Sequence, residues 1–229
     1  MLHKTRAIVL RHINFGDSSI IATLYTEERG RISCMVNSVR SKKPKFPPTL
    51  FQPLTLLEVD LYYRQNREIQ RIKDVSIAFH FQTIPYNYSK NAVALFLSEV
   101  LYLVLREEEG NPHLFSFVYH ALQLFDSIEP GHAAFHHWFM IQLTRYLGFF
   151  PQNLDGFSPE IQAFTGLNSK VSEVLGKLLE STDSLPDITL NKAERNLLLE
   201  RIIRFYGSHV DGFTRLKSFD ILQEVFENK

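Results

Sequence analysis

The sequence has little cysteine and no long uninterrupted apolar run. Its single cysteine, Cys34, excludes an intrachain disulfide and a cysteine-ligated zinc site. The longest apolar stretch, residues 92–105, contains Ser98 and Glu99 and is too short to span a bilayer. We therefore expect a cytoplasmic protein without a membrane-spanning segment.

The sequence also lacks the motifs of the common enzyme classes. It contains no glycine-rich phosphate-binding loop, no G-x-S-x-G turn and no H-E-x-x-H helix. The acidic run Glu107–Glu109 stands just before Gly110, which is more typical of a solvated helix end than of a nuclease site. His132 and His136 share the spacing of two zinc ligands but have no evident third ligand. We expect no catalytic residue, no metal, no cofactor and no enzymatic activity.

Charge is balanced over the whole chain and unevenly distributed along it. The chain has 25 Lys and Arg residues and 25 Asp and Glu residues. Residues 1–75 hold 13 of the cations and 7 of the anions, a net charge of +6, and the remainder carries −6. A neutral chain can still bind nucleic acid, because binding depends on the local field of one face.

The two halves also differ in hydrophobic period. Residues 5–77 divide into five short segments that mostly alternate apolar and polar residues, as where Ile32, Cys34 and Val36 share one face. The fifth segment alternates poorly, so we expect a bulge or a bend there. Five short strands in this length are typical of a small closed barrel of the oligonucleotide-binding type.

From Tyr86 onward apolar residues recur three and four apart, which predicts helices. Pro112 suits a first helical turn, Gly148 a helix end, and Asn191 with Glu194 a capping box. We therefore predict an α+β, multi-domain chain. An oligonucleotide-binding β-barrel over residues 1–79 precedes an all-α helical domain over residues 80–229, with a looser segment at 150–170.

The densest positive charge lies on a proline-stiffened loop between the third and fourth predicted strands. In "VNSVRSKKPKFPPTLFQP", residues 36–53, prolines exclude a long helix and four cations stand close together: Arg40, Lys42, Lys43 and Lys45. Further cations, Arg64, Arg67 and Arg71, lie near Tyr62 and Tyr63. Lysines can simply keep a sheet edge soluble. Cations interleaved with aromatics are also what single-strand binding requires, and we predict that these seven residues bind nucleic acid.

At this point the sequence resembles a known family. "RAIVLRHINFGDSSIIATLYTEERGRISCMVNSVRSKK" is similar to the start of RecO, the bacterial recombination and repair mediator family, in its Phe15-Gly16-Asp17, Thr26-Glu27 and Val39-Arg40-Ser41-Lys42 elements. The similarity continues, in order, through "FQPLTLLEV", "LFLSEVLYLVL", "FHHWFMIQLTRYLGFFP" and "RLKSFDILQEVF". It covers most of the chain.

The resemblance implies a protein that binds single- and double-stranded DNA, anneals complementary strands and associates with the nucleoid when bound. It further implies the partner RecR, with which the family helps load RecA on strands coated by single-strand-binding protein. The C-terminal tail of that protein would bind the helical domain, where we favour Arg201 and Arg204. The four-cysteine zinc ribbon of many relatives is missing from residues 150–170. An RNA-binding barrel and a protein–protein adaptor remain alternatives.

Overall fold

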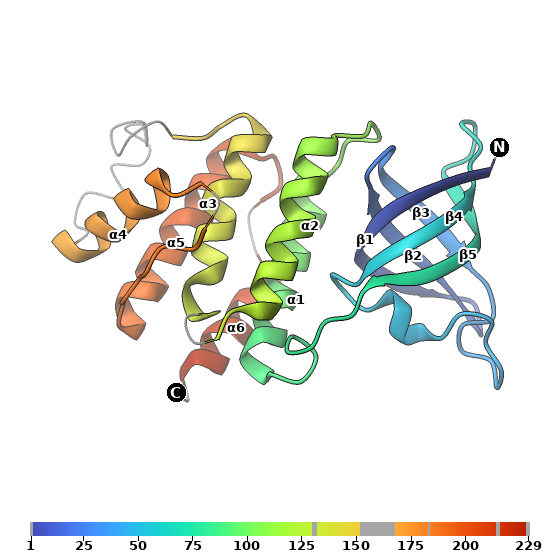
Figure 1. Ribbon diagram of the computed structural model, residues 1–229, viewed down its shortest axis with the longest axis horizontal. Helices are drawn as coiled ribbons and strands as arrows, with labels where there is room; N and C mark the ends of the chain where they lie inside the picture. The colour runs from blue at the N-terminus through green and yellow to red at the C-terminus, as the bar shows by residue number, and fades with distance from the viewer. Residues whose placement is uncertain (1, 130–131, 152–167, 183, 214–215, 228–229) are drawn as a thin grey trace.

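The computed structural model describes residues 2–129, 132–151, 168–182, 184–213 and 216–227. Figure 1 shows a β-barrel at one end of an elongated molecule, with α1 and α2 beside it and α4 at the far end. The strands are β1 (Leu2–Phe15), β2 (Ser19–Thr26), β3 (Gly30–Val36), β4 (Leu56–Tyr62) and β5 (Ile69–Phe79). The helices are α1 (Tyr88–Val104), α2 (Pro112–Ser127), α3 (Phe135–Leu147), α4 (Ser169–Glu180), α5 (Lys192–His209) and α6 (Lys217–Glu227). Two 3-10 turns, η1 (Pro48–Phe51) and η2 (His132–Ala134), complete the described elements.

The barrel closes in the strand order β1-β2-β3-β5-β4, with β3 and β5 parallel and the other pairs antiparallel. This order is that of the oligonucleotide-binding fold, so the predicted fold class is confirmed. The predicted inward face of the third strand is also confirmed, because Ile32, Cys34 and Val36 lie in the barrel core. Burial raises the pKa of the Cys34 thiol to about 12, which keeps it protonated and unreactive.

The irregularity predicted for the fifth strand is present. The pairing of β4 with β5 shifts between Leu56 and Leu57 and again between Asp60 and Leu61, so β5 carries an extra residue at each place. Between β3 and β4 the prolines permit only the single turn η1, as the sequence predicts. These features leave the loop after β3 projecting from the barrel (Figure 1).

The helix boundaries follow the capping residues of the sequence. Pro112 is in the first turn of α2, and α3 ends at Gly148 in the left-handed conformation with φ 84°. Asn191 and Glu194 form the predicted capping box at the start of α5. In the part of the chain that the structure describes, no helix is long and apolar enough to cross a membrane.

The barrel and the helices pack against each other through a shared core. Leu10 and Tyr25 of the barrel are buried in the cluster formed by the helices. At the edge of this contact, the guanidinium carbons of Arg11 and Arg31 lie 3.6 and 4.2 Å from the centre of the Tyr102 ring of α1. Both arginines therefore face the helices.

A buried carboxylate fixes the connection between β5 and α1. Asp126 of α2 accepts hydrogen bonds from the backbone N–H groups of Gln82, Thr83 and Ile84. Burial alone would raise the pKa of Asp126, but these bonds outweigh it and lower that pKa. Lys90, itself fully buried, donates from Nζ to Thr83 Oγ1 and to the Asp126 carbonyl. The barrel is therefore held in one orientation on the helices.

Candidate nucleic-acid interface

The four predicted cations of the loop after β3 project from the end of the barrel. We call residues 37–46 the basic loop. The Arg40 backbone N–H donates to the Ser18 carbonyl at 3.0 Å, and its Nη2 donates to the Gly16 carbonyl at 2.7 Å. Lys42 and Lys43 are exposed and form no ion pair with the described residues. The loop is thus anchored on the β1–β2 turn while its lysines remain open to a ligand.

The fourth loop cation, Lys45, connects the loop to the next strand of the barrel. Its Nζ donates to the Lys73 carbonyl of β5 at 2.6 Å and lies 4.6 Å from the centre of the Phe46 ring. Neither contact removes the charge of the ammonium group. Lys73 is itself exposed, so β5 continues the positive surface that the loop begins.

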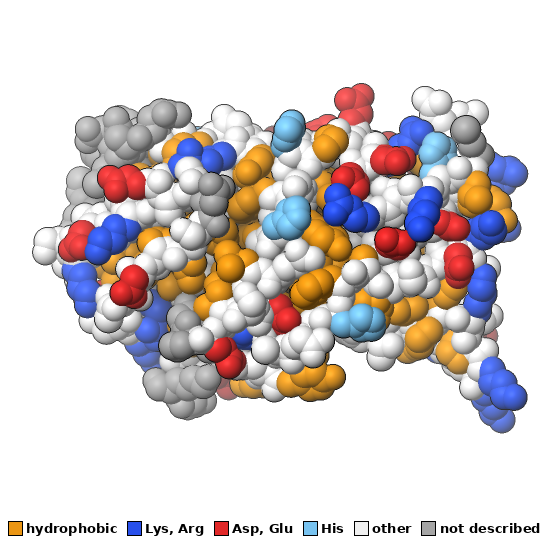
Figure 2. Space-filling model, in the orientation of Figure 1, with side chains coloured by type: hydrophobic (Ala, Val, Ile, Leu, Met, Phe, Trp, Pro, Cys, Tyr) orange, Lys and Arg blue, Asp and Glu red, His pale blue; other side chains and the backbone are white. Residues whose placement is uncertain are grey.

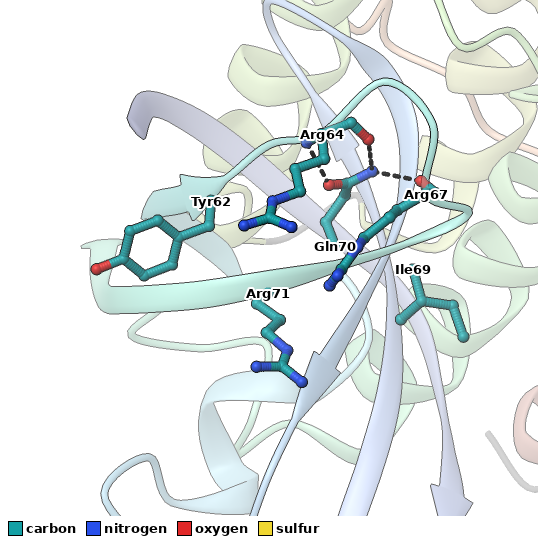
Figure 3. Close-up of a pocket in the computed structure, with 6 residues that line it drawn as sticks. All are labelled: Tyr62, Arg64, Arg67, Ile69, Gln70 and Arg71. Atoms are coloured by element: carbon teal, nitrogen blue, oxygen red, sulfur yellow. Dashed lines mark hydrogen bonds between the residues drawn. The ribbon is translucent and has the colours of Figure 1, made fainter. Parts of the chain in front are cut away.

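The three predicted arginines of the β4–β5 hairpin line one hollow of about 280 Å³, which we call the arginine hollow. Figure 3 shows Arg64, Arg67 and Arg71 around it, with the ring of Tyr62 at its edge. Tyr62 is 50% exposed. The predicted cations of the hairpin therefore do lie together, beside an aromatic ring on which a base could stack.

Gln70 shapes the arginine hollow and was missed by the sequence reasoning. Its Nε2 donates to the Arg64 and Arg67 carbonyls at 3.0 and 2.5 Å, and its Oε1 accepts from the Arg64 N–H at 2.8 Å. These bonds, dashed in Figure 3, close the hairpin loop on itself. The only signal in the sequence was a polar residue at an inward-facing position of a strand.

The electrostatics of the arginine hollow favour an anion. Arg64, Arg67 and Arg71 form no salt bridge with any described residue, and no carboxylate lines the hollow. Three cations in one small hollow repel one another, and a bound phosphate would remove that repulsion. Arginine also binds phosphate in a bidentate manner.

The sheet register joins the arginine hollow to the basic loop. Arg71 pairs with Met35, one residue before the end of β3, and the basic loop begins directly after Val36. Farther along β5, Lys73 meets Lys45. Figure 2 shows Lys and Arg side chains at the barrel end of the molecule, interspersed with Asp and Glu, and further Lys and Arg side chains at the helical end. Lys45 and Arg71 thus lie along β5, whereas Arg40 contacts the β1–β2 turn on the other side of β3.

The structure also describes part of the sequence features that were considered for metal binding or catalysis. No group of three or more potential ligands occurs among the residues that the structure describes. His136 is buried, and the side chain of His132 lies outside the described residues. The Glu107–Glu109 run packs by its backbone on the β2–β3 turn, where Arg31 N–H donates to the Glu107 carbonyl. Most of the looser segment, residues 152–167, also lies outside the described residues.

The two cations predicted to bind a partner lie on α5. Arg204 is exposed, whereas Arg201 is half-buried and its Nε has no hydrogen-bond partner among the described residues. Two apolar residues beside these arginines, Ile202 and Phe205, belong to the core.

A second open surface lies on α2 and α3. We call it the aromatic groove; it measures about 470 Å³ and its walls include Phe117, Trp138 and Tyr146. The rings of Phe117 and Tyr146 are stacked 4.7 Å apart, and Tyr146 is 39% exposed.

Comparison with known proteins gives a consistent result over the whole chain. The family model "Recombination protein O N terminal" matches residues 1–81, and "Recombination protein O C terminal" matches residues 85–153. A protein of Bacteroides fragilis named DNA repair protein RecO is 36% identical, over 99% of this chain and 100% of its own length. A protein of the same name from Phocaeicola vulgatus is 33% identical over 99% of this chain and 100% of its own length. Another from Flavobacterium psychrophilum is 33% identical over 97% of this chain and 98% of its own length.

Proposed function

The chain belongs to the RecO family, and we propose that it is a DNA repair protein that binds single- and double-stranded DNA and anneals complementary strands. The observation that carries this proposal is the positive surface along β5. It joins the arginine hollow to the basic loop through the contact of Lys45 with Lys73.

Annealing at this surface needs no catalytic group. Two DNA strands repel each other, and cations that neutralise phosphates on both lower that barrier by releasing counterions. Arg64, Arg67 and Arg71 would hold phosphates of one strand at the hairpin, while Lys42 and Lys43 project from the basic loop toward a second. The protein therefore acts as a mediator and not as an enzyme.

We further propose that the chain works with RecR to load RecA on strands coated by single-strand-binding protein, in the cytoplasm and on the nucleoid. The helical part, residues 80–229, would receive the acidic tail of single-strand-binding protein at Arg201 and Arg204. The exposure of Arg204 supports this assignment, and the burial of Ile202 and Phe205 limits the apolar surface available there. The aromatic groove is the competing position for the tail's hydrophobic end.

The division of the chain at residues 79 and 80 is part of the same proposal. It is supported by β5 ending at Phe79 and α1 beginning at Tyr88. Because Leu10 and Tyr25 of the barrel are buried against the helices, either part alone would expose apolar surface. Experiments should therefore use the full chain.

The direct test is annealing of complementary DNA strands coated with single-strand-binding protein, with fluorescence energy transfer between labelled strands as the measurement. The chain should accelerate annealing without nucleotide or metal. The same strands made as RNA test the alternative of an RNA-binding barrel. Binding to the coating protein without any acceleration would identify an adaptor and overturn the proposal.

A further inference from the structure

Four apolar side chains face outward on the first three strands of the barrel. We call Ile13, Phe15, Ile21 and Met35 the apolar strip. Ile13 and Phe15 are 48% and 51% exposed, and the other two are half-buried. In the register of the sheet, Ile13 pairs with Ile21 and Ile21 with Met35. Paired residues lie side by side on one face, so at least these three form a continuous band across β1, β2 and β3.

The strip is outward-facing because its neighbours in sequence point inward. Ile20 and Ala22 flank Ile21 on β2 and lie in the barrel core, as do Cys34 and Val36 on either side of Met35. Strand side chains alternate between the two faces of a sheet, so Ile21 and Met35 must face away from that core. Arg11, two residues before Ile13 on the same face of β1, lies over Tyr102 of α1, so the strip begins beside the helix contact.

Cations border the apolar strip at two places. Met35 pairs with Arg71 of β5, which also lines the arginine hollow. Near the other end, the Arg40 guanidinium donates to the carbonyl of Gly16, the residue after Phe15. Neither arginine forms a salt bridge with a described residue. The band is therefore apolar in its middle and positive at its borders.

We propose that the apolar strip holds the bases of a bound single strand while its phosphates follow Arg71 and the arginine hollow, which leaves Lys42 and Lys43 of the basic loop for the second strand. The inference rests on the nucleic-acid binding proposed above and adds which residues meet the bases. A single strand has apolar base faces and a charged backbone, and this surface presents both complements side by side. The strip also lies on the second and third strands, the face that such barrels use for oligonucleotides.

The composition of the strip suits a strand that must later be released. Its only aromatic residue is Phe15, so most base contacts are with aliphatic side chains instead of stacked rings. Such contacts are weaker than the base–aromatic stacking of tight single-strand binders. A base on Ile21 or Met35 can therefore leave for a complementary base, as annealing requires.

The experiment compares two DNA strands of equal length and equal phosphate number, one with ordinary bases and one fully abasic. Affinities of the full chain are measured by fluorescence anisotropy at one salt concentration. The wild type should bind the base-bearing strand about tenfold more tightly. The double change Phe15→Ala and Met35→Ala should weaken base-bearing binding by about fivefold to thirtyfold and abasic binding by less than about twofold.

Ile221→Ala supplies the matched control, because Ile221 is 51% exposed, as Phe15 is, and lies on α6, which packs on α1 and α5. It should leave both affinities unchanged. Equal binding of the two strands by the wild type would overturn the inference without any variant, and equal loss for both strands in the double variant would do the same. Binding of neither strand by the wild type would instead contradict the proposed function. If the double variant fails to fold, Phe15→Ser alone, at the exposed end of β1, replaces it.

Discussion

Lys45 of the basic loop and Lys73 of β5 are joined by a hydrogen bond of 2.6 Å from the Lys45 Nζ to the Lys73 carbonyl. Because the acceptor is a carbonyl and not a carboxylate, the contact positions Lys45 without neutralising it. The loop is thereby attached to the strand that also carries Arg71. The contact thus brings Lys45 of the basic loop to the strand that carries Arg71 and Lys73, and the predictions for DNA binding test whether these cations act together.

The first prediction concerns the salt dependence of single-strand binding. Changing Arg40, Lys42, Lys43 and Lys45 together to alanine should weaken binding and flatten its salt dependence. If these residues make two to four phosphate contacts, a plot of log affinity against log salt should lose about 1.5 to 3 units of slope, because fewer counterions are released. Titrations between low and physiological salt measure the slope.

A matched variant distinguishes the loss of phosphate contacts from the loss of net positive charge. Lys170, Lys177, Lys192 and Lys217 lie on the helices, and their joint replacement by alanine removes the same charge as the loop variant. It should shift affinity slightly and leave the slope unchanged. An equal loss of slope in both variants would mean that the basic loop does not contact phosphate.

The second prediction concerns the ring at the edge of the arginine hollow. Tyr62→Ala should weaken single-strand binding by about 1 to 3 kcal/mol, the usual contribution of one stacked base, with little change in salt slope. Tyr86→Ala is the control, since Tyr86 is 85% exposed on the segment before α1. Anisotropy titrations on both variants should show loss only for Tyr62→Ala; similar behaviour of the two would remove Tyr62 from the interface.

The sequence predicts the features that depend on local pattern. Alternation identifies the strands, capping residues such as Asn191 and Gly148 mark helix ends, and the cations of the basic loop are adjacent in the chain. Each of these depends on residues within a few positions of one another, where propensity and geometry are informative.

The remaining features depend on long-range pairing, which periodicity does not encode. The contact of Lys45 with Lys73 and the continuity of Ile21 with Met35 exist only in this strand register. The role of Gln70 depends on how the hairpin loop closes. On α5, Ile202 is buried in the core because its face of the helix packs against neighbouring elements. In a helix with many apolar residues, periodicity alone does not show which face is buried.

The third prediction uses two glycines with opposite expected effects on stability. A Cβ added at Gly110 would lie 2.4 Å from the Glu28 carbonyl oxygen, where the loop after α1 meets the β2–β3 turn. Gly110→Ala should therefore lower the free energy of unfolding by about 2 kcal/mol or more. Gly176 lies within α4, where an added Cβ would meet nothing within 4 Å, and Gly176→Ala should raise the free energy of unfolding by about 0.5 to 1 kcal/mol. Urea unfolding measures both, and a stabilising Gly110→Ala would contradict the close approach.

The fourth prediction concerns acid stability. His136 and His137 are buried with ring centres 4.1 Å apart, and burial lowers the pKa of His137 to about 4. In the unfolded chain a histidine has a pKa near 6.5. As the pH falls from about 6.5 to 4, the unfolded state therefore binds a proton that the folded state does not bind. The free energy of unfolding should decline through that pH window, by at most about 3 kcal/mol from His137. Above about pH 6.5 this histidine should not affect it. Unfolding free energies of the wild type and His137→Gln at pH 7.5, 6 and 5 should diverge; parallel curves would show that His137 titrates normally.

The last prediction places the tail of single-strand-binding protein on the helices. A synthetic acidic peptide with a hydrophobic C-terminus should bind the full chain. Arg204→Gln should weaken binding by about 1 kcal/mol, or fivefold, because an exposed ion pair is lost. Lys177→Gln on α4 is the charge-matched control and should have no effect.

Tyr146→Ala tests the aromatic groove, whose Phe117 and Trp138 could bind the apolar end of the tail instead. Calorimetric titrations decide between them: loss only with Tyr146→Ala would move the tail to the groove, and unchanged binding in both variants would contradict both positions.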